Sequence, residues 1–189
     1  STLFGRLKPY KMEGIRISNL RSIEDSDFVP LLPLNILLGA NSSGKSSLLR
    51  TFPLFQQSLE TRTTGPILWF GHLVDFGSFA DAKNYCAKGD EISFSFRAKS
   101  PLPNTGTQEI FPSRSQAIML GQIEMDVTLV LKASPSKVTY PSEYRLAFLN
   151  DKLNFHFNSD GKVTGAVVNG VSFEDRLKTH ALVEVGQIF

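Results

Sequence analysis

The residues best suited to chemistry lie in one short stretch, "LNILLGANSSGKSSLLRTF", at residues 34–52. This stretch fits the spacing G-x-x-x-x-G-K-[ST] with Gly39, Gly44, Lys45 and Ser46. In loops of this type, backbone N–H groups and the lysine bind phosphates, while the hydroxyl that follows binds Mg²⁺. The spacing therefore predicts a site for a nucleoside triphosphate and its magnesium ion.

We expect the whole loop to form this site, through Gly39, Ala40, Asn41, Ser42, Ser43, Gly44, Lys45, Ser46 and Ser47. The glycines allow backbone angles and a close approach to phosphate that side chains would block. Lys45 is expected to reach the β- and γ-phosphates, and Ser46 is the expected metal ligand. Ser47 either contributes to the site or only helps to cap the helix. The alternative for the entire stretch is a serine-rich turn before an ordinary helix.

The flanking residues predict a strand, a loop and a helix in that order. "LNILL", at residues 34–38, has the pattern of a short buried strand. Residues 45–60 place four apolar side chains at helical spacing: Leu48, Phe52, Phe55 and Leu59. In this arrangement the loop amides and the helix N-terminus face one concavity, where the helix dipole favours negative charge. Pro53 is expected to kink or offset the helix.

The remainder of the chain has the pattern of antiparallel strands. Residues 91–97, "EISFSFR", and 122–132, "QIEMDVTLVLK", alternate apolar with polar side chains. Residues 143–157 are expected to form two strands joined at Asn150-Asp151, and "NSDGK" and "VNGVSF" are expected to form further hairpin turns. We therefore divide the chain into residues 1–60 (strands, loop and helix), 61–97 (connection and first sheet strand), 98–118 (flexible insertion) and 119–189 (antiparallel β subdomain).

The segment "MEGIRISNLRSIEDSDF" also alternates as a strand and precedes the loop by a short connection marked by prolines. Together with the loop, it resembles the N-terminal lobe of ABC-type ATPases of the SMC, RecF and OLD-like (AAA-15) superfamily. The corresponding residues are Ile17, Asn19, Leu20, Arg21, Ser22 and Ile23, then Leu34, Asn35 and the loop 39–46, with Leu20 standing where these heads usually have an aromatic residue. The resemblance implies that Arg21 and Ser22 lie close to the nucleotide, with Arg21 near its phosphates. Alternatively, Arg21 is a solvated charge at a strand end.

A second segment, "VDFGSFADAKNY" at residues 74–85, resembles a stretch of the OLD-like branch. Gly77 suits a tight turn, Ser78 a helix N-cap, and Asp81 the first helical turn. Its purpose is either a structural corner or part of a path from the nucleotide to a partner.

The expected fold class is α/β, the N-terminal lobe of a P-loop ATPase head with an antiparallel β-sheet subdomain, and an incomplete head. The resemblance implies ATP and Mg²⁺ as ligands and a homo-oligomer, a head-to-head dimer around ATP or higher. Hydrolysis would drive or gate a DNA-directed activity, with bacterial anti-phage defence as the context and an effector or nuclease as a partner. The alternatives are a RecF- or SMC-type ATPase of repair or chromosome organisation, and a non-catalytic nucleotide-dependent scaffold or sensor that holds an effector.

The sequence shows no recognisable Walker B or signature motif, so the catalytic residues stay unassigned. "LVDF" and "IEMD" come nearest to a Walker B strand, but neither is an apolar run that ends in Asp-Glu. Gln108, Gln116 and Gln122 are equivalent candidates for the Q-loop glutamine. Either a longer chain or a separate chain supplies these parts, and this chain alone is expected to bind nucleotide weakly or not at all and to hydrolyse little.

Composition excludes few classes. The net charge of +2 argues neither for nor against DNA binding. Cys86 is the one cysteine, so no internal disulfide can form, which favours a reducing compartment. The three histidines have no metal-site spacing. The apolar runs are too short for a membrane span and no secretory signal is recognised, so we expect a cytoplasmic protein without a membrane partner.

Overall fold

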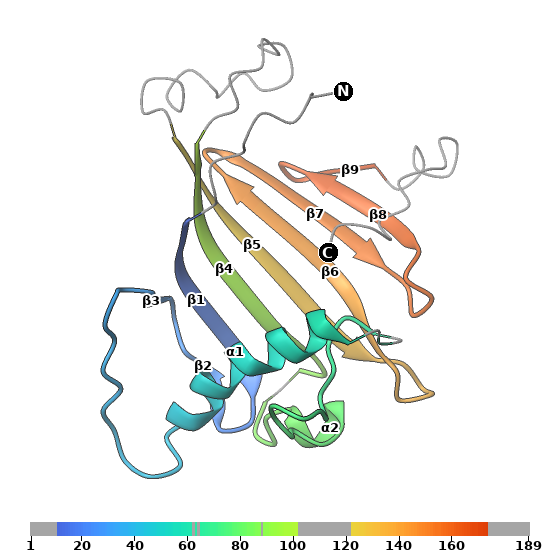
Figure 1. Ribbon diagram of the computed structural model, residues 1–189. Coiled ribbons are helices and arrows are strands. Elements are labelled where there is room, and N and C mark those ends of the chain that lie inside the picture. The colour runs from blue at the N-terminus through green and yellow to red at the C-terminus, as the bar shows by residue number, and fades with distance from the viewer. Residues whose placement is uncertain (1–10, 62, 64, 88, 102–121, 174–189) are drawn as a thin grey trace, which may run out of the picture.

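The computed structural model describes residues 11–61, 63, 65–87, 89–101 and 122–173. In these residues the fold is a mostly antiparallel β-sheet with few helices (Figure 1). The strands are β1 (Lys11–Leu20), β2 (Ile23–Asp25), β3 (Val29–Pro30), β4 (Ile92–Pro101), β5 (Gln122–Ala133), β6 (Thr139–Phe148), β7 (Asp151–Phe157), β8 (Val163–Val168) and β9 (Val171–Ser172). The helices are α1 (Lys45–Glu60) and α2 (Phe79–Ala82).

The strands form one sheet in the order β2-β1-β4-β5-β6-β7-β8-β9, and β3 also pairs with β1. Strands from the ranges 1–60 and 119–189 therefore belong to the same sheet, with β4 between them. The predicted hairpins are confirmed: β6 and β7 pair antiparallel on either side of Asn150, and β8 and β9 pair around Asn169-Gly170. Asn169 and Gly170 both have positive φ, 50° and 85°, as the tightest hairpin turns require.

One face of the sheet carries the core, and α1 crosses this face over β1, β4 and β5 (Figure 1). The alternation predicted for β4 and β5 is confirmed, because Ile92, Phe94 and Leu131 are fully buried. The aromatic ring of Phe55 in α1 packs edge-on against Phe94, at 5.0 Å between ring centroids. The sheet thus fixes the position of the helix that follows the glycine-bounded loop.

The buried face of α1 includes Leu48 and Phe55 of the predicted apolar residues, but neither Phe52 nor Leu59. Leu48, Thr51, Leu54 and Gln57 are buried, whereas Phe52 and Leu59 are 40% and 69% exposed. The helix carries two apolar stripes, and the sheet covers only one of them. α1 continues through Pro53 as a single helix to Glu60. Within the described ranges, no helix combines the length and apolarity needed to cross a bilayer.

The prediction of a buried strand at residues 34–38 is wrong for the described structure. This segment is not a strand but part of the loop that connects β3 to α1, and it lies beside the sheet (Figure 1). Leu34, Ile36 and Leu38 are 76%, 74% and 88% exposed, and only Leu37 packs against the core. Strand β1 is already paired with β2, β3 and β4, so the described sheet offers this segment no neighbour with which to satisfy its backbone groups.

The expected insertion at residues 98–118 also needs a correction at its start. β4 continues to Pro101 and pairs with β5 over its whole length, so residues 98–101 are strand. Residues 102–118 lie outside the described residues. Apolar and polar side chains alternate only weakly in "RAKSP", residues 97–101, so the sequence placed the end of the strand too early. Pairing with β5 extends β4 to Pro101.

Candidate functional site

The glycine-bounded loop leads directly into the N-terminus of α1, which begins at Lys45. Gly44 is the N-cap residue, and no side chain caps the helix. The first turn contains no acidic residue. Because the first N–H groups of a helix have no acceptor inside it, this end presents uncapped donors and the positive end of the helix dipole. Such an end favours binding of an anion.

Lys45 lies across the loop rather than extending into solvent. Its ammonium group donates to the carbonyl oxygens of Gly39, at 2.7 Å, and Ala40, at 2.5 Å. A third, longer contact of 3.3 Å reaches the Ser43 hydroxyl. A lysine has three N–H donors, so these contacts direct all of them to the loop. The positive charge is thereby fixed next to the uncapped end of α1.

The remaining loop residues present polar groups at the surface. The side chains of Asn41, Ser42, Ser43 and Ser46 are exposed, while Ser47 is half-buried. The hydroxyl of Ser46 is therefore accessible to a ligand. Ser47 provides no side-chain cap, so the capping role left open for it is not found.

The loop contacts the turn between β1 and β2 through Gly44. This glycine has a φ of 92°, and a Cβ placed on it would lie 2.7 Å from Cγ1 of Ile23. The same Cβ would lie 3.5 Å from the Ser22 hydroxyl oxygen. The structure therefore brings Ser22 next to the loop.

Gly44→Ala is expected to lower the free energy of unfolding by about 2–4 kcal/mol, because a left-handed backbone and a contact with Ile23 both oppose the new methyl group. Gly161→Ala is the matched control, since Gly161 has a φ of 75° but a Cβ added there would meet nothing within 4 Å. Urea unfolding of both variants separates backbone strain from the clash. Equal destabilisation would contradict the contact between the loop and the β1–β2 turn.

The segment 74–85 forms the turn and short helix that the sequence predicted. Gly77 has a φ of 76°, and Ser78 and Asp81 form a reciprocal capping box at the start of α2. The Ser78 hydroxyl and backbone N–H both donate to Oδ2 of Asp81, at 2.7 and 2.8 Å. These hydrogen bonds, followed by the charge of Arg21, hold the pKa of Asp81 below its ordinary value.

Arg21 lies beside this segment, in the turn between β1 and β2. Its backbone N–H donates to the Ala82 carbonyl at 2.7 Å. Its guanidinium carbon lies 5.5 Å from the centroid of the Phe76 ring. Arg21 is exposed, whereas Phe76 is 1% exposed. The β1–β2 turn thus contacts the glycine-bounded loop through Ser22 and the segment 74–85 through Arg21.

Both candidates for a Walker B carboxylate accept hydrogen bonds from neighbouring residues. Asp75 of "LVDF" accepts a hydrogen bond from the Gly77 N–H at 2.6 Å and belongs to the turn. Asp126 of "IEMD" lies in β5 and accepts two hydrogen bonds from Arg97, each of 2.8 Å. Among the described residues, no group of three or more His, Cys, Asp or Glu side chains could hold a metal ion.

Of the Q-loop candidates, Gln122 begins β5, and Gln108 and Gln116 lie outside the described residues.

The sequence analysis missed Gln57, which connects α1 to the segment 66–77. Its fully buried amide donates to the carbonyls of Leu68, at 2.6 Å, and Val74, at 3.1 Å. Its oxygen accepts from the backbone N–H groups of Leu73 and Val74, at 3.2 and 3.0 Å. The sequence signal that could have identified it is its spacing, because Gln57 follows Leu54 by three positions and so lies on the same buried face of the helix.

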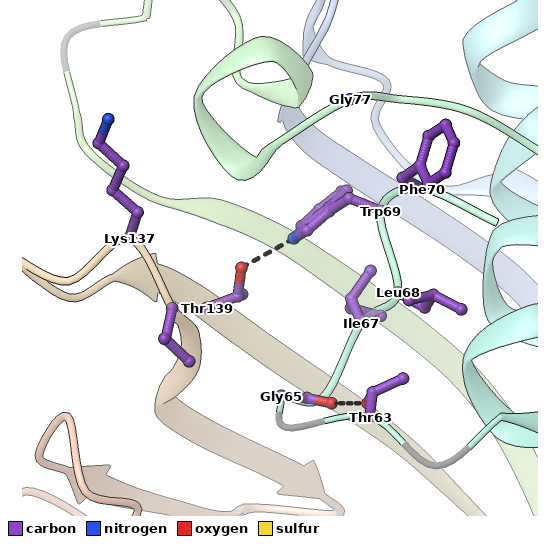
Figure 2. A pocket seen from close by; sticks show the side chains of 10 residues that line it. Thr63, Gly65, Ile67, Leu68, Trp69, Phe70, Gly77, Lys137 and Thr139 are labelled. Carbon is purple, nitrogen blue, oxygen red and sulfur yellow. Dashed lines mark hydrogen bonds between the residues drawn. The ribbon is translucent and has the colours of Figure 1, made fainter.

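An open pocket of about 400 Å³ lies between the segment 63–77 and the β5–β6 hairpin. Figure 2 shows the Trp69 indole pointing across it to Thr139, to which Nε1 donates at 2.8 Å. These two polar groups satisfy each other. The pocket follows the C-terminal end of α1, and a helix of 16 residues spans about 24 Å. It is therefore separate from the loop at the other end of the helix.

Comparison of this chain with protein-family models, with curated proteins and with solved structures finds no match.

Proposed function

We propose that this chain is the nucleotide-binding lobe of an ABC-type ATPase head of the SMC/RecF/OLD-like kind, which binds ATP and Mg²⁺ at residues 39–47. The observation that carries the proposal is the position of Lys45. Its ammonium group is bonded to the loop carbonyls at an uncapped helix N-terminus. A fixed cation and uncapped amides together suit a polyphosphate better than either does alone.

The residues present fit a triphosphate and its metal ion. Lys45 and the first-turn amides of α1 would bind phosphate oxygens, and the exposed Ser46 hydroxyl would bind Mg²⁺. The bound metal ion would neutralise phosphate charge and orient the phosphates. The two Walker B candidates, Asp75 and Asp126, each accept hydrogen bonds from neighbouring residues, and we propose that the group that orients the water for hydrolysis comes from another part of the complete head.

Uncovered apolar side chains on both sides of the loop support an incomplete head. Leu34, Ile36 and Leu38 precede the loop, and Leu49 and Phe52 follow it on the outer face of α1, at 57% and 40% exposure. No charged residue occurs between Asp27 and Lys45. Exposed apolar groups on this scale are typical of a surface that another element covers. In the complete head, we propose, a further strand pairs with residues 34–38.

The wider role that we propose is a cytoplasmic ATPase whose heads associate around ATP and drive or gate a DNA-directed activity, with anti-phage defence as the context. The second candidate is a nucleotide-dependent scaffold or sensor that holds an effector. The ion pair of Asp126 with Arg97 favours this second role, because it engages one of the two Walker B candidates on the sheet.

The test is MgATP-dependent association of the intact native polypeptide, measured by light scattering together with phosphate release. The ATPase predicts association and turnover, and the scaffold predicts association without turnover. Hydrogen exchange on the same sample should show protected amides at residues 35–38 if a strand pairs with them. Identical mass and exchange with and without MgATP, and no turnover, would contradict both roles.

A further inference from the structure

The backbone is left-handed on both sides of Leu20, where β1 ends and the turn to β2 begins. Asn19 and Arg21 have φ of 61° and 53°. Asparagine adopts this conformation readily, but it is costly for arginine and persists where the surroundings fix it. Leu20, between them, is fully buried. The strain therefore points to neighbours that impose this shape on the turn.

Those neighbours belong to the segment 74–85. The Ala82 carbonyl accepts from the Arg21 N–H at 2.7 Å, and the Asn84 N–H donates to the Asn19 carbonyl at 2.9 Å. An isolated β-bridge joins Leu20 to Lys83 between these two hydrogen bonds. Each of the two left-handed residues is thus tied by a backbone hydrogen bond to the end of α2 or to the residues just after it.

The same segment also surrounds the Arg21 side chain. The guanidinium carbon lies 5.5 Å from the centroid of the Phe76 ring, within the range of a cation–π contact. Phe76 is nearly fully buried, so its ring is a fixed surface. Asp81, tied to Ser78 by the capping box, adds a negative charge close to Arg21.

The other side of the turn faces the glycine-bounded loop. Ser22, the next residue, lies against Gly44, the last residue before α1. Arg21 therefore belongs to the turn that contacts the loop. Arg21 is exposed, and its guanidinium has no salt-bridge partner among the described residues.

We infer that the segment 74–85 is a positioning device, in which Phe76 and the end of α2 hold the Arg21 guanidinium for contact with the phosphates of the bound nucleotide. This inference rests on the proposed nucleotide site and deepens it. Arg21 touches the phosphates, and Phe76 acts on them only through Arg21. The segment is then more than a structural corner.

A double-mutant cycle between Arg21 and Phe76 tests this inference. The dissociation constant for MgATP is measured by calorimetry in the intact native polypeptide. Arg21→Ala is expected to raise it about tenfold, the effect of one charge-assisted hydrogen bond, and Phe76→Leu about threefold. Because Phe76 acts through Arg21, the double variant should match Arg21→Ala at about tenfold, rather than the roughly thirtyfold of independent effects.

Phe70→Leu is the matched control, because Phe70 lies on the same connecting segment and is 67% exposed. It should leave the dissociation constant unchanged. Should Phe76→Leu fail to fold, Phe76→Met keeps more of the side-chain volume while removing the ring. A role of Phe76 in packing alone would weaken binding equally with and without Arg21.

Lys45→Ala separates the failure of this inference from that of the proposed function. Suppose that Lys45→Ala weakens binding of MgATP, but the effects of Arg21→Ala and Phe76→Leu on the dissociation constant are independent, or Phe76→Leu has no effect. This result overturns the positioning role and leaves the nucleotide site standing. Binding that does not depend on Lys45 overturns the nucleotide site, and the positioning role with it. Coupling between Phe76 and Arg21 together with Lys45 dependence supports both.

Discussion

Lys45→Ala is expected to raise the dissociation constant for MgATP by a factor of about 10 to 150, corresponding to about 1.5–3 kcal/mol for hydrogen bonds to a charged group. The structure shows the ammonium group already fixed at the loop by its contacts with Gly39 and Ala40. Contact with phosphate therefore replaces one or more of these loop contacts, while the ammonium group stays at the loop. Calorimetric titration of the intact native polypeptide measures the change.

Lys162→Ala is the matched control for this prediction. Lys162 is an exposed lysine in the turn between β7 and β8, far along the sheet order from the strand that contacts the loop. Both variants remove one surface charge, and both should unfold at nearly the wild-type temperature. If the two variants bind MgATP equally, Lys45 has no particular role and the proposed site is wrong.

Gln57→Leu is expected to lower the free energy of unfolding by about 3–5 kcal/mol, the largest effect on stability that we predict. Leucine has a similar volume, so the loss comes from polarity rather than from a cavity. It leaves the carbonyls of Leu68 and Val74 and the N–H groups of Leu73 and Val74 without their buried partner. Each unsatisfied buried group carries a desolvation cost.

Gln56→Leu provides the comparison at the neighbouring position. Gln56 is exposed, and its side-chain amide donates to Glu60 on the same helix, at 2.8 Å. Its replacement should change the free energy of unfolding by no more than about 0.5 kcal/mol. Urea unfolding of the two variants measures the difference. Similar values would show that the segment 66–77 does not depend on the Gln57 amide.

The sequence predicted the antiparallel strands because their alternation and turn residues are local signals. Phe94 and Leu131 are buried as their spacing indicates, and Asn169-Gly170 forms the expected turn. The N-cap position of Ser78 and the first-turn position of Asp81 are equally local, and both predictions are confirmed. Such features depend on neighbours in the chain, so the pattern alone identifies them.

The errors concern features that depend on distant partners. The apolar run at residues 34–38 has the composition of a buried strand, but a strand also requires a neighbouring strand, which the described residues do not provide. In α1 the sequence contains two apolar stripes, and the sheet selects the one that includes Leu48 and Leu54. The role of Gln57 depends on its contacts with the backbone of Leu68, Leu73 and Val74, which the apolar periodicity of the helix sequence does not reveal.

Within the candidate site, the loop itself was the predictable part. The spacing of Gly44 and Lys45 identified the start of α1, and the lysine lies on the loop. The contact of Arg21 with Phe76 joins residues that are far apart in the sequence, and no local pattern encodes it. The resemblance placed Arg21 near the phosphates, but the residues that hold it emerge only from the fold.

The most direct measurement is a titration of the isotope-labelled intact native polypeptide with MgATP, followed through the backbone amide resonances of residues 40–47. Our account predicts saturable shifts at these amides, largest at Gly44–Ser47 where α1 presents its uncapped N–H groups, and the loss of these shifts in Lys45→Ala. Unchanged loop resonances at saturating MgATP, or shifts that persist without Lys45, would contradict it.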